Sequence, residues 1–531
     1  MKRIDRLSAL IECSTASTPT IESLKQYINM LAQMGYSELY LGLTDAYKIE
    51  TEPYFNYMRG GYTTEQLNEI DSYAKKQGIE VIASIQTLAH LHYLKKYGPY
   101  TELFDTDHIL LVGDERVYAL IEKMFQTISS GISSKKIHLG YDEAKGLGTG
   151  KYYDLHGEND PRELLLRHLK RVIQIAEKYG YTCEIWADTL MNERKSKITA
   201  KEIKESLPDS TEVIYWNYYL GDYNKLCTEV DKLKCHADKV GFAGSVLKAS
   251  GFAPYNRISI QNILTQMRVC AEKGISHYMV TLWTDNGAQC SEWAVLPALF
   301  TVAEYANGNI CCEEEVDKNK FFEITGCYYD DLKKLDYLND PFKRNLPTRN
   351  TNSYWILFAD IMLCNYDLLL SAGVGKAYKN LAKEYAESAK RNVCKEVFEI
   401  TAKMAEILAI KSEIGVNLRK LYKEGNLEGL KKLQAEELTL LIDRMKEFIP
   451  VFNRYWLNQR MGFGLERNHL FLGGQVARYK YIYERINEYL KHGKRVDELE
   501  AQALPPVFLK DISEDNCIEV DLKNILTYCG F

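Results

Sequence analysis

Eight short apolar runs alternate with amphipathic helical stretches over the first 300 residues, and this alternation constrains the fold more than any other feature. Each run has the length and composition of a strand buried on both faces. The expected strands are residues 8–13, 38–43, 80–86, 136–142, 181–187, 212–217, 240–247 and 277–283. Helical patterns, each with a capping residue or a proline at its start, include residues 20–36, 63–78 and 161–180.

Two architectures accommodate such alternation: a closed (β/α)8 barrel and an open doubly wound sheet. Eight evenly spaced units, with polar and aromatic residues clustered where strands end, favour the barrel, whose usual length is about 250 residues. We therefore predict a (β/α)8 TIM barrel over residues 1–310. An acidic, irregular connector follows over residues 311–350, and residues 351–531 form long helical patterns. These predict a mostly α-helical C-terminal domain that serves packing or dimerisation.

The composition excludes several classes of partner. Lysine and arginine number 67 against 73 acidic residues, a net charge of −6 without a basic stripe, so neither nucleic acid nor a membrane surface is expected to bind. No uncharged apolar run reaches the ~18 residues of a membrane span, and the first residues do not resemble a secretory signal. Thirteen cysteines, an odd number without a CxxC pair, predict reduced thiols in a cytoplasmic protein.

Chemically active side chains gather where the expected strands stop, which in a barrel is the face that carries active sites. The stretch IHLGYDEAKG places Asp142 and Glu143 side by side after the fourth apolar run. Adjacent carboxylates repel, so one of them tends to hold a proton near neutral pH. The other strand ends carry Gln86, His90, Trp186, Asp188, Tyr215, Trp216, Asn217, Trp283 and Asp285. Indoles edged with carboxylates suit a sugar, which has apolar faces and hydroxyl edges.

Other interpretations of these residues are weaker. The glycine-rich stretch GLGTGK lacks the spacing of a phosphate-binding loop, and Tyr152 stands where serine or threonine should follow Lys151. The histidines and aspartates at the strand ends do not have the spacing of a known metal-binding motif, so neither a metal nor another cofactor is expected. The alternative interpretation is that Asp142 and Glu143 are a solvated surface pair. The polar and aromatic motifs at the other strand ends disfavour it.

Several of these stretches resemble a known family. HLGYDEA is similar to the H-x-G-x-D-E signature of glycoside hydrolase family 20, the β-N-acetylhexosaminidases. EPYFNYMRGGYT, IQTLAHL, DEAKGLGTGKYYDLHG, GFAP, WTDNGAQCSEWAVLPAL and, in the helical region, GFGLERNHLFLGG resemble its intracellular streptococcal-type branch. The resemblance covers most of the chain. It implies a barrel with a helical C-terminal domain, a homodimer, and an oligosaccharide or glycoconjugate as substrate.

The resemblance also implies a mechanism, the substrate-assisted exception to two-carboxylate glycoside hydrolysis. The 2-acetamido oxygen of the sugar attacks the anomeric carbon and forms an oxazolinium ion. Asp142 would hold the acetamido N–H and stabilise the developing positive charge. Glu143 would protonate the leaving oxygen and then deprotonate water, while Tyr215 would donate to the acetamido carbonyl. The residues expected to contact or support the substrate are Trp186, Trp283, Asp285, Asn217, Thr15, Asp45, Arg59, His90, His138, Lys248 and Leu247.

The chain departs from the family pattern at four places. Where members usually carry Asp-x-Ser-Arg after strand one, with an arginine that clamps O3 and O4, residues 12–15 read Glu-Cys-Ser-Thr. The Tyr-Trp-Asp pattern of strand six reads Tyr-Trp-Asn at residues 215–217. Two tryptophans around a lysine are replaced by Leu-Lys-Ala at residues 247–249, and the Thr-Glu-Asp motif after strand two keeps only Asp45.

These departures spare the acetamido and proton-transfer groups and change those that grip the far edge of the sugar. A pocket built to hydrogen-bond hydroxyls discriminates strongly, so the pattern predicts altered glycone specificity. The expected substrate is an acetamido sugar substituted at O3, O4 or O6, a differently configured 2-acetamido sugar, or a disaccharide unit released whole. The alternative is a catalytically idle relative that binds glycans.

Overall fold

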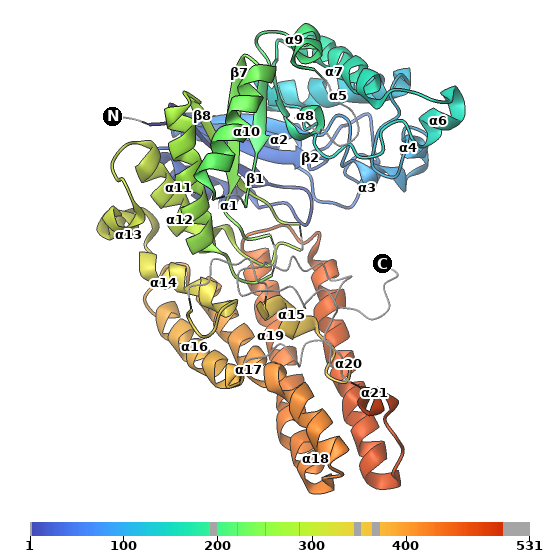
Figure 1. The fold of residues 1–531 in the computed structure, drawn as a ribbon, viewed down its shortest axis with the longest axis vertical. Helices are drawn as coiled ribbons and strands as arrows, with labels where there is room; N and C mark the ends of the chain where they lie inside the picture. Colours follow the sequence, from blue (N-terminus) through green and yellow to red (C-terminus); the bar gives the residue numbers. More distant parts are fainter. Residues whose placement is uncertain are drawn as a thin grey trace. The chain divides into compact units, whose positions relative to one another are not determined.

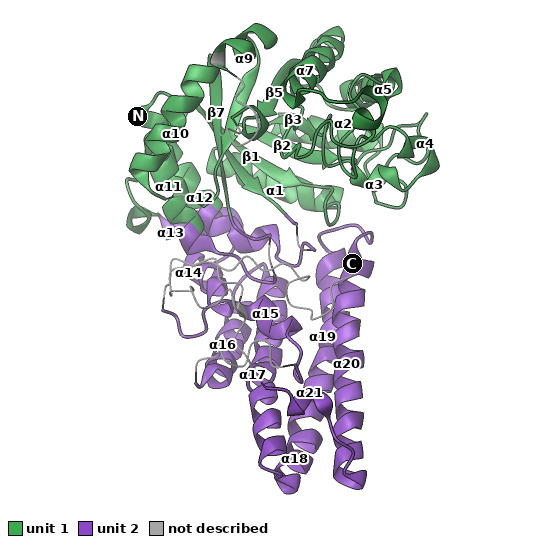
Figure 2. Ribbon diagram, turned by 45° about the vertical axis from the view of Figure 1, so that its right-hand side comes forward, with its two compact units in different colours: residues 1–246, 259–283, 299–316 green, residues 247–258, 284–298, 317–531 purple. Residues whose placement is uncertain are grey.

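The computed structural model describes residues 3–191, 199–219, 221–249, 251–285, 287–344, 352–363 and 372–502. The chain divides into two compact units that interleave along the sequence (Figure 2). The first unit comprises residues 1–246, 259–283 and 299–316, and the second comprises residues 247–258, 284–298 and 317–531. The domain limits predicted above, 1–310, 311–350 and 351–531, stay a prediction, and residues 364–371 and 503–531 lie outside the described part.

Eight parallel strands in the first unit close into a barrel in the order β1 to β8, which confirms the predicted (β/α)8 fold (Figure 1). The closing pair is β1 with β8, so Ala9 lies between Leu39 of β2 and Val280 of β8. The strands are β1 Arg6–Glu12, β2 Glu38–Thr44, β3 Glu80–Ile85, β4 Lys136–His138, β5 Thr182–Trp186, β6 Glu212–Trp216, β7 Lys239–Ser245 and β8 His277–Leu282.

β4 ends earlier than the sequence predicts. The expected strand ran to Asp142, whereas the extended backbone stops at His138. Gly140 and Tyr141 both have φ of 77°, in the left-handed region that no strand adopts. The apolar character of this run misled the prediction, because a buried turn is as apolar as a buried strand.

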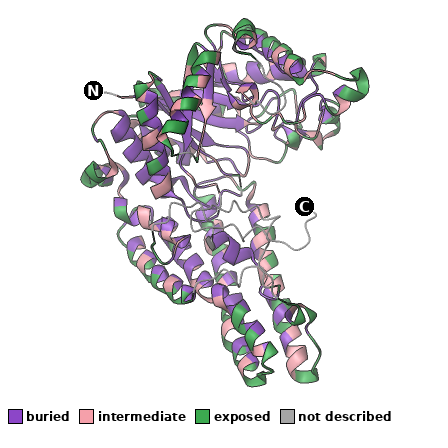
Figure 3. Ribbon diagram, viewed as in Figure 1, coloured by how far each residue is buried: buried purple, intermediate pink, exposed green. Residues whose placement is uncertain are grey.

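Alternate residues of the strands fill the barrel. The cluster at its centre consists of Leu10, Tyr40, Ile82, Trp186, Ile214, Ala243 and Met279, with Trp216 and Trp283 packed against it. Figure 3 shows burial concentrated on the strands and on the helix faces that cover them. On β6, Ile214 and Trp216 therefore share the inward face, and the residue between them points to the surrounding helices.

Capping residues mark where the helices after the strands begin. The Thr20 side chain accepts from the Ser23 N–H at the start of α1, and Thr63 and Gln66 form a capping box at α2. The first twelve helices are α1 Ile21–Met34, α2 Thr64–Lys76, α3 His92–Lys95, α4 Gly98–Thr101, α5 Glu115–Gly131, α6 Lys151–His156, α7 Pro161–Lys178, α8 Asp188–Met191, α9 Ala200–Ser206, α10 Tyr223–His236, α11 Asn256–Glu272 and α12 Leu296–Ala306.

The C-terminal part of the second unit is mostly helical, as predicted. Its longest helices, α17 and α20, have 29 and 28 residues. The helices are α13 Lys318–Thr325, α14 Tyr329–Lys333, α15 Asn352–Phe358, α16 Val374–Ala389, α17 Lys395–Lys423, α18 Leu427–Leu433, α19 Thr439–Leu457, α20 Leu465–His492 and α21 Asp497–Glu500. Among the described residues, no helix combines the length and the apolar character needed to cross a membrane.

An ionic network occupies the N-terminal end of the barrel. The Arg6 guanidinium lies 3.0 Å from Glu38, 3.1 Å from Glu184 and 2.7 Å from Glu212. Nδ1 of His277 lies 3.0 Å from the Glu212 carboxylate. Burial, together with the neighbouring Glu212 charge, raises the pKa of Glu184 to about 7. One arginine from β1 thus pairs with carboxylates from β2, β5 and β6 and links β1 to two strands, β5 and β6, with which it does not pair directly.

Replacing Arg6 should therefore destabilise the first unit. Arg6→Met leaves the buried Glu184 without its cation, while Glu38 keeps Lys136 and Glu212 keeps His277, and breaking a buried ion pair in this way typically costs about 3 kcal/mol. We expect a clearly lower melting temperature for the variant, measured by circular dichroism. Arg116→Met is the matched control, because the exposed Arg116 pairs with Asp114 at the surface and its loss should leave the melting temperature nearly unchanged. Equal melting of the two variants would contradict the linking role of Arg6.

Candidate active site

The adjacent acids stand on a strained turn after β4. Tyr141 and Glu143 are non-glycine residues with φ of 77° and 52°, and Gly140 has φ of 77°. Such conformations persist only where the surroundings hold them, and they concentrate at functional sites. Nδ1 of His138 accepts the Gly140 N–H at 3.1 Å, which fixes the start of the turn. The turn presents two consecutive carboxylates at the C-terminal end of β4.

Asp142 is held as a carboxylate by two neighbours from the loop after β3. Gln86 Nε2 donates to its Oδ1 at 2.9 Å, and His90 Nε2 lies 3.1 Å from its Oδ2. Burial alone would raise the pKa of Asp142, but the paired His90 and the Gln86 bond outweigh it and lower that pKa. Burial likewise opposes the charge on His90, yet the Asp142 carboxylate raises the His90 pKa to about 9. At neutral pH the site therefore holds an aspartate–imidazolium pair.

Glu143 has a different environment. Its side chain is 45% exposed, against 18% for Asp142, and its carboxylate lies 3.4 Å from the exposed Lys145 ammonium. The backbone N–H of Glu143 donates to Asp188 Oδ2 at 2.9 Å. One acid is thus enclosed and charged, while its neighbour reaches towards solvent. Carboxyl groups placed in such contrasting environments can divide electrostatic and proton-transfer roles.

Two of the predicted indoles meet beside this turn. The ring centroids of Trp186 and Trp283 lie 6.4 Å apart at 59°, and His138 lies 4.3 Å from Trp186. His138 is fully buried, and burial lowers its pKa to about 3, so the ring is neutral. The structure therefore brings Trp186, Trp283 and His138 together, as the sequence predicted, and gives His138 a supporting position behind Trp186.

The structure contradicts the role expected for Tyr215. Because Ile214 and Trp216 face the barrel interior, Tyr215 points to the helical layer. Its ring packs edge-to-face on Phe242 at 5.4 Å, and its hydroxyl accepts from Asn217 Nδ2 at 3.3 Å. Oδ1 of Asn217 accepts the Tyr219 N–H at 3.1 Å. The side chain of Tyr215 thus faces the helical layer and not the interior of the barrel.

Tyr218, two residues beyond the end of β6, lies beside the indoles of Trp216 and Trp283. Its hydroxyl is hydrogen-bonded to the side chains of Trp283 and Thr281, and its ring stacks on Trp216 at 5.1 Å. Burial raises the pKa of Tyr218 well above the usual value, and the Asp142 charge adds to this rise. A neutral phenol, electrostatically coupled to Asp142 and in contact with an indole of the site, is a hydrogen-bond donor for a ligand oxygen.

Thr15, Asp45 and Arg59 form a second cluster at the ends of β1 and β2. Arg59 Nε donates to Asp45 Oδ2 at 2.6 Å, and its Nη2 donates to the Ser14 carbonyl at 2.7 Å. Its guanidinium also lies 3.6 Å from the centroid of the Tyr93 ring. Thr15 Oγ1 donates to the buried Glu12 carboxylate. A guanidinium thus lies beside the end of strand one although no arginine is present in that segment.

Leu247, Lys248 and Asp285 belong to the second unit. The Lys248 ammonium is fully buried, 3.0 Å from the Glu292 carboxylate, which also accepts from Arg460 at 2.7 Å. Because the Lys248 ammonium is paired within this buried ion triad, the structure argues against the sugar contact predicted for it. Leu247 is half-buried, and Asp285 is exposed, with its carbonyl accepting from Arg467 at 3.4 Å. Substrate contacts by these two residues stay predictions.

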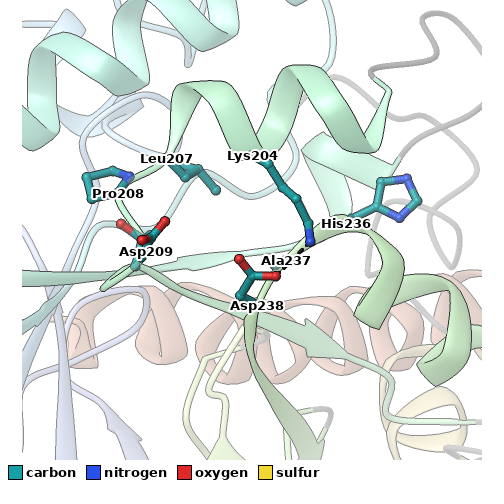
Figure 4. A pocket seen from close by; sticks show the side chains of 8 residues that line it. Lys204, Leu207, Pro208, Asp209, His236, Ala237 and Asp238 are labelled. Carbon is teal, nitrogen blue, oxygen red and sulfur yellow. Dashed lines mark hydrogen bonds and ion pairs between the residues drawn. The ribbon is translucent and has the colours of Figure 1, made fainter.

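Two other features of the first unit do not compete with this site. Within the described part of the chain, Glu184, Glu212 and His277 bring donor atoms close enough for a metal, but the Arg6 guanidinium already pairs with both carboxylates. A shallow hollow, drawn in Figure 4, includes Lys204 and Asp238, whose charged ends lie 2.7 Å apart. Its lining residues precede β6 and β7, so it lies at the barrel end that does not carry the acid pair.

Sequence reasoning noticed Gln86 and Asp188 at strand ends but gave them no role, and it missed Tyr218. A signal for Tyr218 was present in the alternation of β6. Glu212, Ile214 and Trp216 face one way, so the next inward position is residue 218. No sequence signal connects Asp188 to Glu143, because their hydrogen bond joins the ends of two strands.

Two family models match the chain. Residues 18–232 match the glycosyl hydrolase family 20 catalytic domain. The chain belongs to glycoside hydrolase family 20. Residues 328–517 match the glycoside hydrolase 20C C-terminal domain, which associates the helical region with that particular group.

The individual relatives are distant. Human hexosaminidase D is 22% identical over 209 residues, which are 38% of this chain and 42% of that protein, so the chain spans less than half of this curated relative. The exo-β-N-acetylglucosaminidase of Vibrio harveyi is 15% identical with a TM-score of 0.48, covering 63% of this chain and 59% of the other. The Flavobacterium johnsoniae chitobiase is 13% identical with a TM-score of 0.47, covering 94% and 74%.

The Asp142–His90 pair makes stability depend on pH. Because the folded pKa of His90, about 9, exceeds its ordinary value of 6.5, the pair contributes fully below pH 6.5 and its contribution disappears as the pH rises through 9. Wild type should therefore melt above His90→Gln at pH 6.5, and this difference should shrink towards pH 10. Thermal melts across this range measure it. In an Asp142→Asn background His90→Gln should have no such pH-dependent effect, and persistence of the effect would contradict the pairing.

Proposed function

We propose that this chain is a glycoside hydrolase that cleaves β-linked 2-acetamido-2-deoxy sugars of the GlcNAc or GalNAc type. The observation that carries the proposal is the pair of consecutive acids in contrasting environments. Asp142 is enclosed and kept ionised by His90 and Gln86, while the neighbouring Glu143 carboxyl is half exposed. Membership of family 20 and the similarity to human hexosaminidase D support the substrate class.

In the proposed reaction the acetamido oxygen of the substrate attacks the anomeric carbon while the bond to the leaving oxygen breaks. Glu143 gives its proton to that oxygen, and the Asp142 carboxylate holds the acetamido N–H and balances the positive oxazolinium ring. Water then attacks the same carbon and passes a proton to Glu143, and the ring opens. Two displacements at one carbon leave its configuration retained.

The surrounding side chains support this assignment. Trp186 and Trp283 offer apolar walls to the acetamido methyl group and the sugar ring. The Tyr218 hydroxyl, next to Trp283 and coupled to Asp142, is the donor we propose for the acetamido oxygen. It would align that oxygen for attack and favour the reactive conformation of the substrate.

We also propose that the glycone is not a simple terminal acetamido sugar. The segment that usually supplies a clamping arginine ends in Thr15, and Thr15 is engaged with Glu12. The nearby Arg59 is bound to Asp45 and to the Ser14 carbonyl, which leaves it less free to grip hydroxyls. A substituent at O3, O4 or O6, a differently configured sugar, or a second sugar released as part of a disaccharide fits such an altered edge.

Cytoplasmic location and a homodimer complete the proposal. The cysteines among the described residues are free thiols, as a reducing compartment would keep them. Leu457, Phe463 and Leu470 on and between α19 and α20 are 52%, 41% and 75% exposed, an apolar surface that a second copy would cover. Sedimentation of the purified protein would measure its assembly.

Product analysis tests the activity and the specificity together. Wild type and Glu143→Gln are incubated with simple β-GlcNAc and β-GalNAc glycosides and with a pool of mucin and milk oligosaccharides, and products are identified by mass spectrometry. We expect little release from the simple glycosides and a decorated sugar or disaccharide from the pool. Glu143→Gln should lose ~100-fold or more of this activity, because proton transfer to the leaving group is removed.

Ready release of free GlcNAc or GalNAc from the simple glycosides would contradict the altered specificity and leave the activity standing. Silence on every substrate would favour the alternative, an idle relative that binds glycans. A thiazoline mimic of the oxazolinium intermediate separates these cases, because an enzyme binds it far more tightly than the free sugar. Similar affinities for the mimic and the sugar would count against catalysis.

Exchanging phenol for phenyl distinguishes Tyr215 of β6 from Tyr218, which follows this strand. Tyr218→Phe removes the proposed donor to the acetamido oxygen and should lower kcat/KM by ~10-fold to 100-fold, the usual cost of one well-placed donor. Tyr215→Phe, which faces the helices, should stay within about 3-fold of wild type. Kinetics on the best substrate from the product analysis measure both. The reverse order of effects would restore the assignment made from the sequence.

A further inference from the structure

We propose that Asp188 is a positioning residue for the acid/base group: it holds the strained backbone of Glu143 in the orientation that proton transfer requires. This inference rests on the proposed function and adds to it a residue that would act through Glu143 without touching the substrate. The turn that carries Glu143 needs stabilisation, because Gly140, Tyr141 and Glu143 all have left-handed backbone conformations.

Three hydrogen bonds from the end of β5 hold this turn. The Trp186 N–H donates to the Gly140 carbonyl at 2.9 Å, and Thr189 Oγ1 donates to the Tyr141 carbonyl. Asp188 completes the set by accepting the N–H of Glu143 at 2.9 Å. The first two bonds fix carbonyls that precede the acid pair. The third acts on the residue that carries the proton, and it is the one made by an ionisable side chain.

The second oxygen of Asp188 is also engaged. Its Oδ1 accepts from Trp216 Nε1 at 3.1 Å, so one carboxylate joins the turn after β4 to the inward-facing indole of β6. Trp216 packs against the barrel core, which anchors this end of the bridge. A side chain with both oxygens occupied and both partners fixed has little freedom to rotate. Glu143 is therefore tied to the rigid barrel through Asp188.

The charges around Asp188 make this bridge sensitive to protonation. Burial raises the pKa of Asp188 to about 6, and the charges of Asp142 and Glu143 add to the rise, while the Glu143 N–H and the Trp216 N–H oppose it. His90, the cation of this cluster, is paired with Asp142. A proton on either oxygen of Asp188 would meet an N–H donor and disrupt one of the two bonds. The bridge is thus complete above about pH 6 and weakened below it.

Substitution of Asp188 tests the role. Asp188→Ala removes both bonds and should lower kcat by ~100-fold with KM within about 3-fold, since misplacement of a catalytic group by an ångström can cost this much. Asp188→Asn keeps one acceptor and should lower kcat by ~10-fold. It should also remove the acidic limb near pH 6 from the profile of kcat/KM, because the amide does not titrate. Thr189→Val is the matched control: it loses a bond to the same turn, yet should keep that limb.

A readout independent of hydrolysis accompanies the kinetics. Hydrogen exchange followed by mass spectrometry, on the peptide that contains residues 140–145, should show the Glu143 amide exchanging ~10-fold faster in Asp188→Ala than in wild type. Circular dichroism checks folding, and Asp188→Asn carries the test if the alanine variant does not fold. Unchanged exchange, or a kcat within about 3-fold of wild type with the acidic limb intact, would overturn the positioning role. An inactive wild type would instead refute the proposed function, and the exchange measurement would still decide whether Asp188 holds the turn.

Discussion

Closure of the parallel barrel is the constraint on which the candidate site depends. Because β1 pairs with both β2 and β8, all eight strands end at one rim, and side chains far apart in the sequence become neighbours there. Gln86 and His90 reach Asp142 across the ends of β3 and β4, and Asp188 reaches Glu143 across β4 and β5. At the other end, Arg6 forms ion pairs with acids from three strands. Each end of the barrel thus carries a polar network around an apolar centre.

The acid pair shows how one backbone turn separates two identical chemical groups. Consecutive residues on an extended strand would point to opposite faces, whereas the left-handed turn after β4 presents both carboxylates at the rim. Asp142 receives a cation and an amide donor, which fix its charge. Glu143 donates its backbone N–H to Asp188, and its carboxyl is left half exposed. The contrast in environment, more than the adjacency, allows the two carboxyl groups to take different chemical roles.

The charged side chains at the ends of β1 and β2 are paired with each other. Asp45 and Arg59 satisfy each other at 2.6 Å, and the arginine also binds the Ser14 carbonyl. In the second unit, Lys248 is likewise paired with Glu292 in a buried triad. The charged side chains of Asp45 and Arg59 are thus engaged with each other and with the backbone. This engagement is one basis of the proposal, made above, that the glycone is decorated or larger than a simple acetamido sugar.

The sequence by itself determined the barrel, the helical C-terminal region and the position of the acid pair, because these follow from local periodicity and from a motif written in consecutive residues. It did not determine the end of β4, since an apolar turn and an apolar strand read alike. It also did not determine whether Tyr215 of β6 or Tyr218 after it lies beside the indoles, because a resemblance aligns residue types and does not give side-chain directions. Tertiary structure decided that Tyr218 lies beside Trp283, that His90 pairs with Asp142, that Lys248 is buried, and that Asp188 accepts the Glu143 N–H. Each of these depends on distances between strand ends, which exist only once the barrel has closed.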